Sequence, residues 1–150
     1  MVEFRAFDSE DVDRFDSPMA ELAGVPDWRG MVRQAAWSGP AWTGWHDGEG
    51  GWRPLGCGGL ALAWAGRAQA WCVLAPDIPR TVWPAIHRAV AMRLDQAAQV
   101  FELRRIEAEA MLGFLPAARW LRLLGFEAEG VMRNYGPRGE DFLRFARVAG

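Results

Sequence analysis

Residues 117–136 read A-A-R-W-L-R-L-L-G-F-E-A-E-G-V-M-R-N-Y-G, and this stretch decides the fold. Its first half predicts a helix, because apolar residues recur at helical spacing at Ala117, Trp120, Leu121 and Leu124. Gly125 is where this helix should end, since glycine readily adopts the left-handed conformation that closes many helices. Phe126 then leads into a predicted strand. The order helix, Gly-Phe, strand is the feature from which the rest of the interpretation follows.

This ending resembles the C-terminal part of the GCN5-related N-acetyltransferase (GNAT) superfamily. There a helix closes with a Gly-Phe pair and passes into an E-G-x-x-R strand, which here is Glu129 to Arg133. The resemblance implies an α/β (α+β) fold and the transfer of an acyl group from acetyl-CoA to an amine. The chain also resembles the divergent GNAT-like proteins of phages and prophages. That second likeness implies a protein of the cytoplasm or one associated with a virion or other particle.

Length and composition limit the other functions. The 150 residues predict a single GNAT-like domain, residues 1–150, with a net charge of −2. That charge argues against nucleic acid as a partner, because nucleic-acid binding requires a basic face. No apolar run approaches the roughly 20 residues needed to cross a bilayer, so no membrane partner is expected. Two cysteines are too few for a disulfide framework and favour a reducing compartment.

The apolar periodicity along the chain predicts the element order β-α-α-β-β-β-α-β-α-β-β. This order agrees with the GNAT order over the whole chain and implies a mixed, twisted sheet of about seven strands. The sheet should splay between strands 68–75 and 104–111, with helix 80–99 crossing between them. A glycine-rich run, G-C-G-G at residues 56–59, predicts a β-bulge within the strand 52–64.

The resemblance places the pyrophosphate of acetyl-CoA on a Q/R-x-x-G-x-G/A loop at the start of the third helix. Free backbone N–H groups and the helix dipole bind anions there. The matching stretch here is R-T-V-W-P-A at residues 80–85. The resemblance implies that the pyrophosphate is bound by loop residues Arg80, Thr81, Val82, Trp83 and Ala85. It implies that the pantetheine lies along strand residues Val73, Leu74 and Ala75.

Two residues of this loop depart from the family pattern. Trp83 stands where the first glycine belongs, and Pro84 removes an N–H that could face phosphate. One interpretation is a modified cradle in which Arg80, Thr81 and the helix N-terminus hold an anion. The other is a proline-started helix whose tryptophan fills the cofactor cleft. Acetyl-CoA is therefore expected to bind weakly or not at all.

The catalytic positions implied by the family are also altered. A frequent acid is a tyrosine in the last helix, where this chain has Leu121, and a common asparagine is replaced by Phe114. Alternation on strand 104–111 sends Glu107 and Glu109 to one face. Glu109 is the better placed to act as a general base near the splay. The alternative is that these carboxylates pair with arginines of the closing hairpin, such as Arg133.

Other candidate sites are weaker. His46 and His87 lack partners at metal-ligand spacing, so no metal is expected. Trp42, Trp45 and Trp52 cluster around one hairpin, and an exposed patch of them would suggest a protein partner.

Two functions therefore stay open. The first is an acetyl-CoA-dependent N-acyltransferase with a degenerate cofactor loop, acting on an unknown amine of a small molecule or a protein. The second is a catalytically inactive binding or structural module with the GNAT fold.

Overall fold

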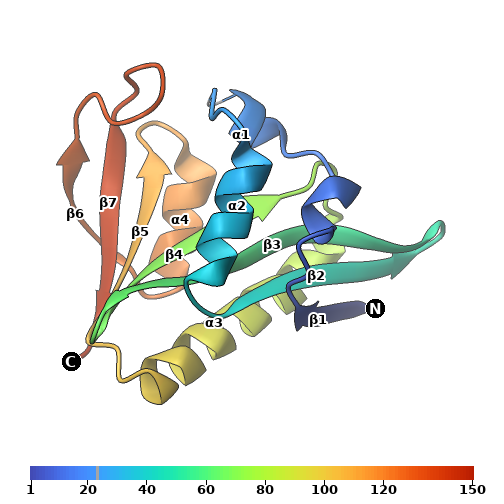
Figure 1. Cartoon of the computed structure of the whole chain (residues 1–150), viewed down its shortest axis with the longest axis horizontal. Coiled ribbons are helices and arrows are strands. Elements are labelled where there is room, and N and C mark those ends of the chain that lie inside the picture. Colours follow the sequence, from blue (N-terminus) through green and yellow to red (C-terminus); the bar gives the residue numbers. More distant parts are fainter. Residues whose placement is uncertain (23) are drawn as a thin grey trace.

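A mixed sheet with strand order β1-β2-β3-β4-β5-β7-β6 runs through the protein (Figure 1). The computed structural model describes residues 1–22 and 24–150, and within them the sheet has seven strands. Their bounds are β1 Val2–Ala6, β2 Ala41–Gly48, β3 Gly51–Trp64, β4 Arg67–Leu74, β5 Arg105–Met111, β6 Glu127–Met132 and β7 Phe142–Val148.

Helices cover both faces of the sheet. They are η1 Asp11–Arg14, α1 Pro18–Leu22, α2 Trp28–Trp37, η2 Arg80–Val82, α3 Trp83–Val100 and α4 Leu115–Leu123, where η denotes a 3₁₀ turn. Figure 1 shows α1 and α2 on one face and α4 on the other, with α3 running along the same side as α4. We call these the α2 face and the α3 face. The mixed α/β fold class expected from the sequence is confirmed, as is the order of the elements.

The sheet divides between β4 and β5. These two parallel strands are hydrogen-bonded over three residue pairs, from Arg67–Arg105 to Gln69–Glu107. Beyond those pairs the strands diverge, and Figure 1 shows β5 and β7 fanning away from β4. β4 continues on β3 as far as Leu74, and β5 continues on β7 as far as Met111. The predicted splay is therefore confirmed, and α3 is the crossover that joins its two sides.

The end of α4 shows why the Gly-Phe pair decides the local structure. Gly125 has φ +93°, and its N–H bonds to the carbonyl of Arg122 at 3.0 Å. The N–H of Phe126 bonds to the carbonyl of Leu121, also at 3.0 Å. This pair of bonds is a Schellman motif, which satisfies carbonyls that the helix end would otherwise leave free. It turns the chain so that Phe126 is buried and β6 can begin.

The predicted bulge exists, but it lies just before the glycine run. The register between β2 and β3 shifts because Gly44 pairs with Gly56 while Trp45 pairs with Pro54, which leaves Leu55 extra. Gly56 has φ +151°, and a Cβ there would lie 2.4 Å from the carbonyl oxygen of Val73. The bulge turns Leu55 into the core beside Val82 and Ile86, on the α3 face.

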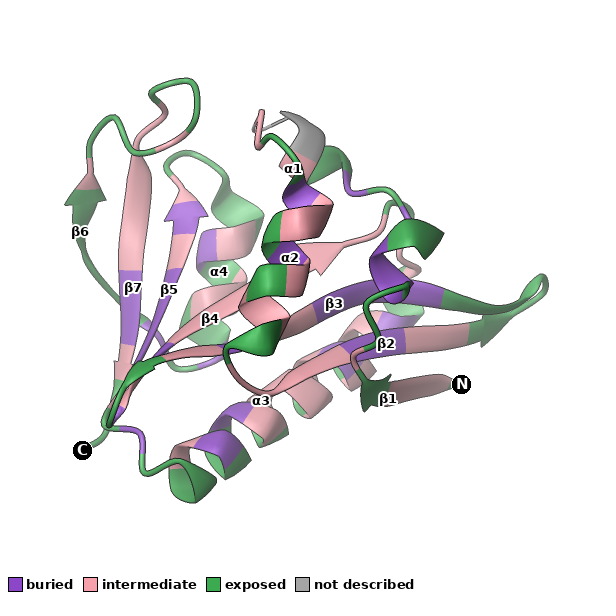
Figure 2. Ribbon diagram, in the orientation of Figure 1, coloured by how far each residue is buried: buried purple, intermediate pink, exposed green. Residues whose placement is uncertain are grey.

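The largest core cluster lies between β5, β7 and helices α3 and α4. Phe145 of β7 is completely buried there, among Leu94, Ile106, Leu124 and Phe126. β5 contributes mainly small side chains to this cluster, because alanines occupy positions 108 and 110. At the edge of the sheet β6 is exposed along most of its length, as Figure 2 shows. The interior between β4 and β5 is where we expect a ligand site, because the two strands part there.

We predict that Phe145→Ala lowers the free energy of unfolding by about 3–5 kcal/mol, because it leaves a cavity at the centre of the largest core cluster. Urea denaturation followed by circular dichroism measures this loss. Leu123→Ala is the matched control, since Leu123 is 74% exposed and its removal should change stability by less than roughly 0.5 kcal/mol. Equal effects of the two substitutions would contradict the assignment of the core.

Candidate active site

A cavity of about 370 Å³ opens where β4 and β5 part. Leu74 and Cys72 of β4 line it from one side, and Ala108 and Glu109 of β5 from the other. Helix α4 contributes Leu121 together with other apolar residues. The cavity is thus an apolar space with few polar groups, which is the usual character of small-molecule sites.

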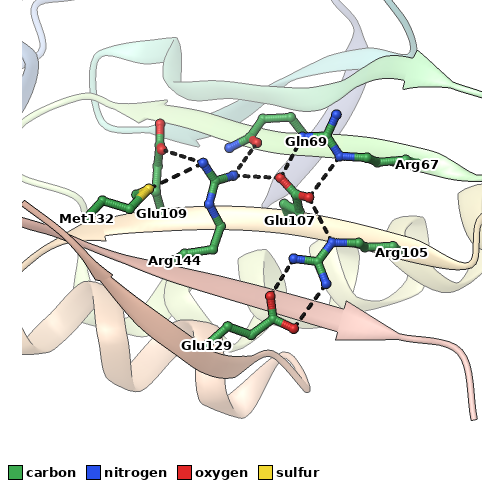
Figure 3. Close-up of polar contacts among 8 residues, drawn as sticks. All are labelled: Arg67, Gln69, Arg105, Glu107, Glu109, Glu129, Met132 and Arg144. Carbon is green, nitrogen blue, oxygen red and sulfur yellow. Dashed lines mark hydrogen bonds and ion pairs between the residues drawn. The ribbon is translucent and has the colours of Figure 1, made fainter. Parts of the chain in front are cut away.

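The Glu107 carboxylate lies at the last residue pair before the strands part (Figure 3). It accepts two hydrogen bonds from Arg67, at 2.8 and 2.9 Å, and one from Arg105 at 2.7 Å. Arg144 of β7 adds a fourth bond, at 2.6 Å. The carboxylate is buried, with 8% of its side chain exposed. Hydrogen bonds from Arg67 and then Arg105 outweigh burial and lower the pKa of Glu107 to about 2.

Glu109 lies two residues further along β5 on the same face, beyond the last β4–β5 pair. Its nearest cation is Arg144, whose Nη2 is 3.8 Å from Oε2, and that oxygen is buried without a hydrogen bond. Tyr135 is close to the same carboxylate, and burial followed by the influence of Glu109 raises the pKa of Tyr135. One oxygen of Glu109 is therefore left to accept a proton or a cationic group.

Arg144 ties the two carboxylates together. Its Nη1 donates to Gln69 Oε1 at 3.0 Å as well as to Glu107, and its Nη2 contacts the sulfur of Met132 at 3.4 Å. Gln69 belongs to β4, so Arg144 bridges the two sides of the sheet at the point of division. Arg144 therefore makes its hydrogen bonds to Glu107 and Gln69, and its contact with Glu109 is a longer ion pair of 3.8 Å.

Two further polar groups of β4 reach the cavity. The indole N–H of Trp71 is buried without a hydrogen-bond partner among the described residues. The thiol of Cys72 opens into the cavity, yet the apolar walls around it raise its pKa to about 11. Trp71 is therefore a donor available to a ligand, whereas Cys72 is a poor nucleophile at neutral pH.

The predicted phosphate loop forms the 3₁₀ turn η2 and the first turn of α3. The N–H of Val82 bonds to the carbonyl of Pro79 at 3.1 Å, and the N–H of Trp83 bonds to the carbonyl of Arg80. Pro84 has no N–H. Three consecutive positions therefore lack a free donor for an anion. The side chains of Arg80 and Thr81 are exposed, and Val82 is buried in the core.

An aromatic contact joins α3 to α4 beside this loop. The rings of Trp83 and Trp120 meet edge to face, with centroids 5.8 Å apart. The indole N–H of Trp120 donates to Nδ1 of His87 at 3.2 Å. Trp83 is only half-buried, and it packs against the cluster of Leu55 and Ile86. The two helices that border the cavity are thus connected by side chains across its α3 face.

Searches by sequence found no matching family model and no matching curated protein. Comparison of structures does find relatives. A GNAT-family acetyltransferase from Bacillus anthracis superposes with a TM-score of 0.74 at 17% identity, covering 98% of this chain and 94% of the other. The chain has the fold of the GNAT acetyltransferases.

Other GNAT-fold neighbours are enzymes with different acceptors in their names. Ribosomal-protein-S5-alanine acetyltransferase from Vibrio fischeri gives a TM-score of 0.75 at 17% identity, over 98% of this chain and 92% of that one. A variant of spermidine N-acetyltransferase from Vibrio cholerae superposes with a TM-score of 0.66 at 14% identity. The match covers 97% of this chain and 94% of the other. At these identities the neighbours establish the fold, and the acceptor of this protein is a separate question.

The structure brings only part of the predicted site together. Glu109 and Leu74 line the cavity, whereas Val73 packs on the α2 face with Trp28 and Val32. The N–H of Ala75 is already bonded to the carbonyl of Leu55 at 2.9 Å. The assignment of the cofactor-binding residues and of Glu109 stays a prediction.

The tryptophan patch requires a correction. Trp42 lies on the α3 face, where Arg93 stacks on its ring at 5.3 Å. Trp45 and Trp52 lie on the opposite face, with Arg5 about 5 Å from both rings. Trp42 is separated from Trp45 because side chains three residues apart on a strand point to opposite faces. They do not form one patch, and an aromatic partner surface would be limited to Trp45 and Trp52.

The sequence analysis did not identify Arg144 or Tyr135 as neighbours of the candidate base. The alternative that these carboxylates pair with arginines of the closing hairpin is confirmed for Arg144 of β7 in place of Arg133, and Glu107 also pairs with Arg67 of β4 and Arg105 of β5. Alternation on the closing strand could have identified Arg144, since it shares a face with Phe142 and Ala146. Among the described residues no group of three or more His, Cys, Asp or Glu could hold a metal ion.

We predict that the stability conferred by Glu107 is lost in acid. Because its pKa falls from 4.5 to about 2 on folding, the contribution is complete above pH 4.5 and disappears as the pH falls towards 2. Glu107→Gln should lower the free energy of unfolding at pH 7 by roughly 1.5–3 kcal/mol and flatten its dependence on acid. Chemical denaturation at several pH values measures both effects.

Glu127→Gln, on exposed β6, is the control for removing one carboxylate. It should leave both the stability at pH 7 and the acid dependence close to those of the wild type. A Glu107→Gln variant as stable as wild type at pH 7 would mean that the arginine cluster does not depend on this carboxylate.

Proposed function

We propose that this protein is an N-acyltransferase that uses a coenzyme A thioester and has a weakened cofactor loop, with Glu109 as general base. The observation that carries the proposal is the buried, unbonded oxygen of Glu109 at the cavity between β4 and β5. The GNAT fold supports it, because the solved neighbours named above are acetyltransferases. The acceptor is an amine that approaches from the α2 face, to which Glu109 points.

The thioester end of the cofactor fits the cavity. Beyond Gln69 the inner edge of β4 has no strand partner in β5, so its backbone groups are open to an extended ligand. Leu74, Leu121 and Ala117 supply apolar walls there. A bound thioester would supply an acyl carbonyl activated towards attack by an amine.

The pyrophosphate end fits poorly. Backbone N–H groups at positions 82 and 83 are used within the 3₁₀ turn, and Pro84 has none. Arg80 and Thr81 remain as exposed side chains that can contact an anion. Without the backbone donors the loop lacks the close, directional contacts that hold phosphate at helix N-termini. We therefore propose that acetyl-CoA binds weakly.

Glu109 would remove a proton from the attacking ammonium, directly or through one water. Its free oxygen provides the acceptor, and Arg144 lies 3.8 Å from that oxygen as the counter-charge of the carboxylate. Glu107 cannot serve the same purpose, because three arginines occupy its oxygens and its pKa is about 2. The assignment of the base thus follows from which carboxylate is left unpaired.

A second candidate is supported by the aromatic contact across α3 and α4. The contacts of Trp120 with Trp83 and His87 connect the two helices beside the cofactor loop. If these contacts persist with ligand present, the cleft is part of the core and the protein is a catalytically inactive binding or structural module. A cytoplasmic or particle-associated role, as the sequence resemblance to phage and prophage proteins would imply, belongs to this proposal. No helix among the described residues is long and apolar enough to cross a membrane.

We predict that the wild-type protein releases free thiol from acetyl-CoA with at least one amine of a panel of alkylamines, arylalkylamines, polyamines, amino acids and peptides. Glu109→Gln should lower kcat by about 10²–10⁴-fold, the usual contribution of a general base. Glu127→Gln should leave the rate unchanged. A thiol-reactive dye follows the release, and full activity of Glu109→Gln would exclude Glu109 as the base.

We predict that Trp83→Gly combined with Pro84→Ala strengthens coenzyme A binding, because it restores one close backbone approach and one N–H donor. A regained charge-assisted hydrogen bond contributes roughly 1.5–3 kcal/mol, or about ten- to hundredfold in affinity. Isothermal titration with coenzyme A measures the change. Trp37→Ala, which removes a tryptophan that is 90% exposed, is the control and should bind as wild type does.

The same double variant separates the two functions. Loss of about 3–5 kcal/mol of stability with no gain in binding would mean that the cleft has become core, which favours the inactive module. Low-micromolar binding of acetyl-CoA by the wild type would show that Trp83 and Pro84 do not weaken the cofactor loop.

A further inference from the structure

The cavity also extends beneath α3, away from the candidate base. Here it is bounded by Phe4, Trp42 and Gly44 of the sheet and by Val90 and Arg93 of the helix, with Gly58 in its floor. We call this part the α3 chamber. Nothing in the acyl-transfer chemistry proposed above uses Arg93 or the space beside it.

Two glycines let neighbouring residues come close to the floor of this chamber. A Cβ on Gly44 would lie 3.1 Å from the ring of Phe4, and a Cβ on Gly58 would lie 3.1 Å from the carbonyl oxygen of Trp71. Glycine inside a strand often marks a place where a ligand or another part of the chain comes close. The glycines therefore accommodate the Phe4 ring and the backbone of β4, and the open part of the chamber is bounded by the apolar side chains and Arg93.

Arg93 supplies the charge of the chamber. Among the described residues it has no carboxylate partner, its Nε is buried without a hydrogen bond, and its Nη1 makes only a 3.4 Å contact with the carbonyl of Ala89. Its guanidinium lies 5.0 Å from the ring of Phe4 and 5.3 Å from that of Trp42. Burial lowers the pKa of Arg93, which means that the charge is incompletely solvated where it stands.

Shape and charge together specify one class of ligand. A guanidinium with free N–H groups binds a carboxylate through paired hydrogen bonds. Phosphate carries more charge than a single arginine can neutralise, and apolar walls cannot solvate the remainder. The rest of the space is apolar and runs past Gly58 towards Cys72, so it suits an unbranched hydrocarbon chain.

We propose that the α3 chamber binds a monocarboxylic acid with an unbranched apolar chain, its carboxylate on Arg93 and its chain running past Gly58 towards Cys72. This site does not depend on acyl transfer, because it needs neither Glu109 nor the cofactor loop.

The test is a titration of wild-type protein with decanoate, kept below its micelle concentration, by calorimetry and thermal denaturation. Decanol has the chain without the charge, and acetate has the charge without the chain. We expect decanoate to bind at least about tenfold more tightly than either, since both the ion pair and the apolar contact are needed. Equal binding of decanol and decanoate, or no binding of decanoate, would overturn the proposal.

Arg93→Met retains an apolar stem and removes the charge. It should weaken decanoate binding by about tenfold or more and leave decanol binding unchanged. Arg88→Met, on the exposed side of α3, is the matched control and should bind decanoate as wild type does. If Arg93→Met fails to fold, Arg93→Lys keeps a cation without the planar fork and should give intermediate affinity. Undiminished decanoate binding by a folded Arg93 variant would exclude the site.

Discussion

The carboxylate of Glu107 bonds arginines from three strands, β4, β5 and β7, at the point where the sheet divides. β4 and β5 share only three residue pairs, so little backbone hydrogen bonding holds the two halves of the sheet together. The side-chain cluster adds bonds there, and Arg144 extends it to Gln69 across the division. Removing the carboxylate would leave three guanidinium groups close together without a counter-charge.

The division of the sheet creates the cavity and also distinguishes the two carboxylates of β5. Glu107 lies at the last strand pair, where arginines from both halves can reach it. Glu109 lies beyond that pair, where β4 has moved away, so only Arg144 approaches it and one oxygen stays without a bond. A structural ion pair and a candidate base therefore arise two residues apart on the same strand face, and the difference comes from the distance between the strands.

The interior of the protein combines features that oppose cofactor binding with features that favour ligand binding. Towards the start of α3, Trp83 and Trp120 connect the helices, and the 3₁₀ turn uses N–H groups that could bind phosphate. Further along α3, Arg93 lines the apolar part of the cavity with its Nε left without a hydrogen bond. A protein with the GNAT fold can thus have a reduced phosphate loop and still offer polar groups to ligands elsewhere in its interior.

Local features of the fold follow from the sequence alone. Helical spacing and Gly125 predict the Schellman end of α4, and alternation places Glu107 and Glu109 on one face, because both depend on residues a few positions apart. Which carboxylate is paired depends on tertiary structure, since Arg67 and Arg144 lie 40 and 37 residues from Glu107. The contact between Trp120 and His87 spans 33 residues. Local periodicity cannot predict contacts between residues so far apart in the sequence. Only the tertiary structure therefore decides which polar groups are hydrogen-bonded and which remain available for chemistry.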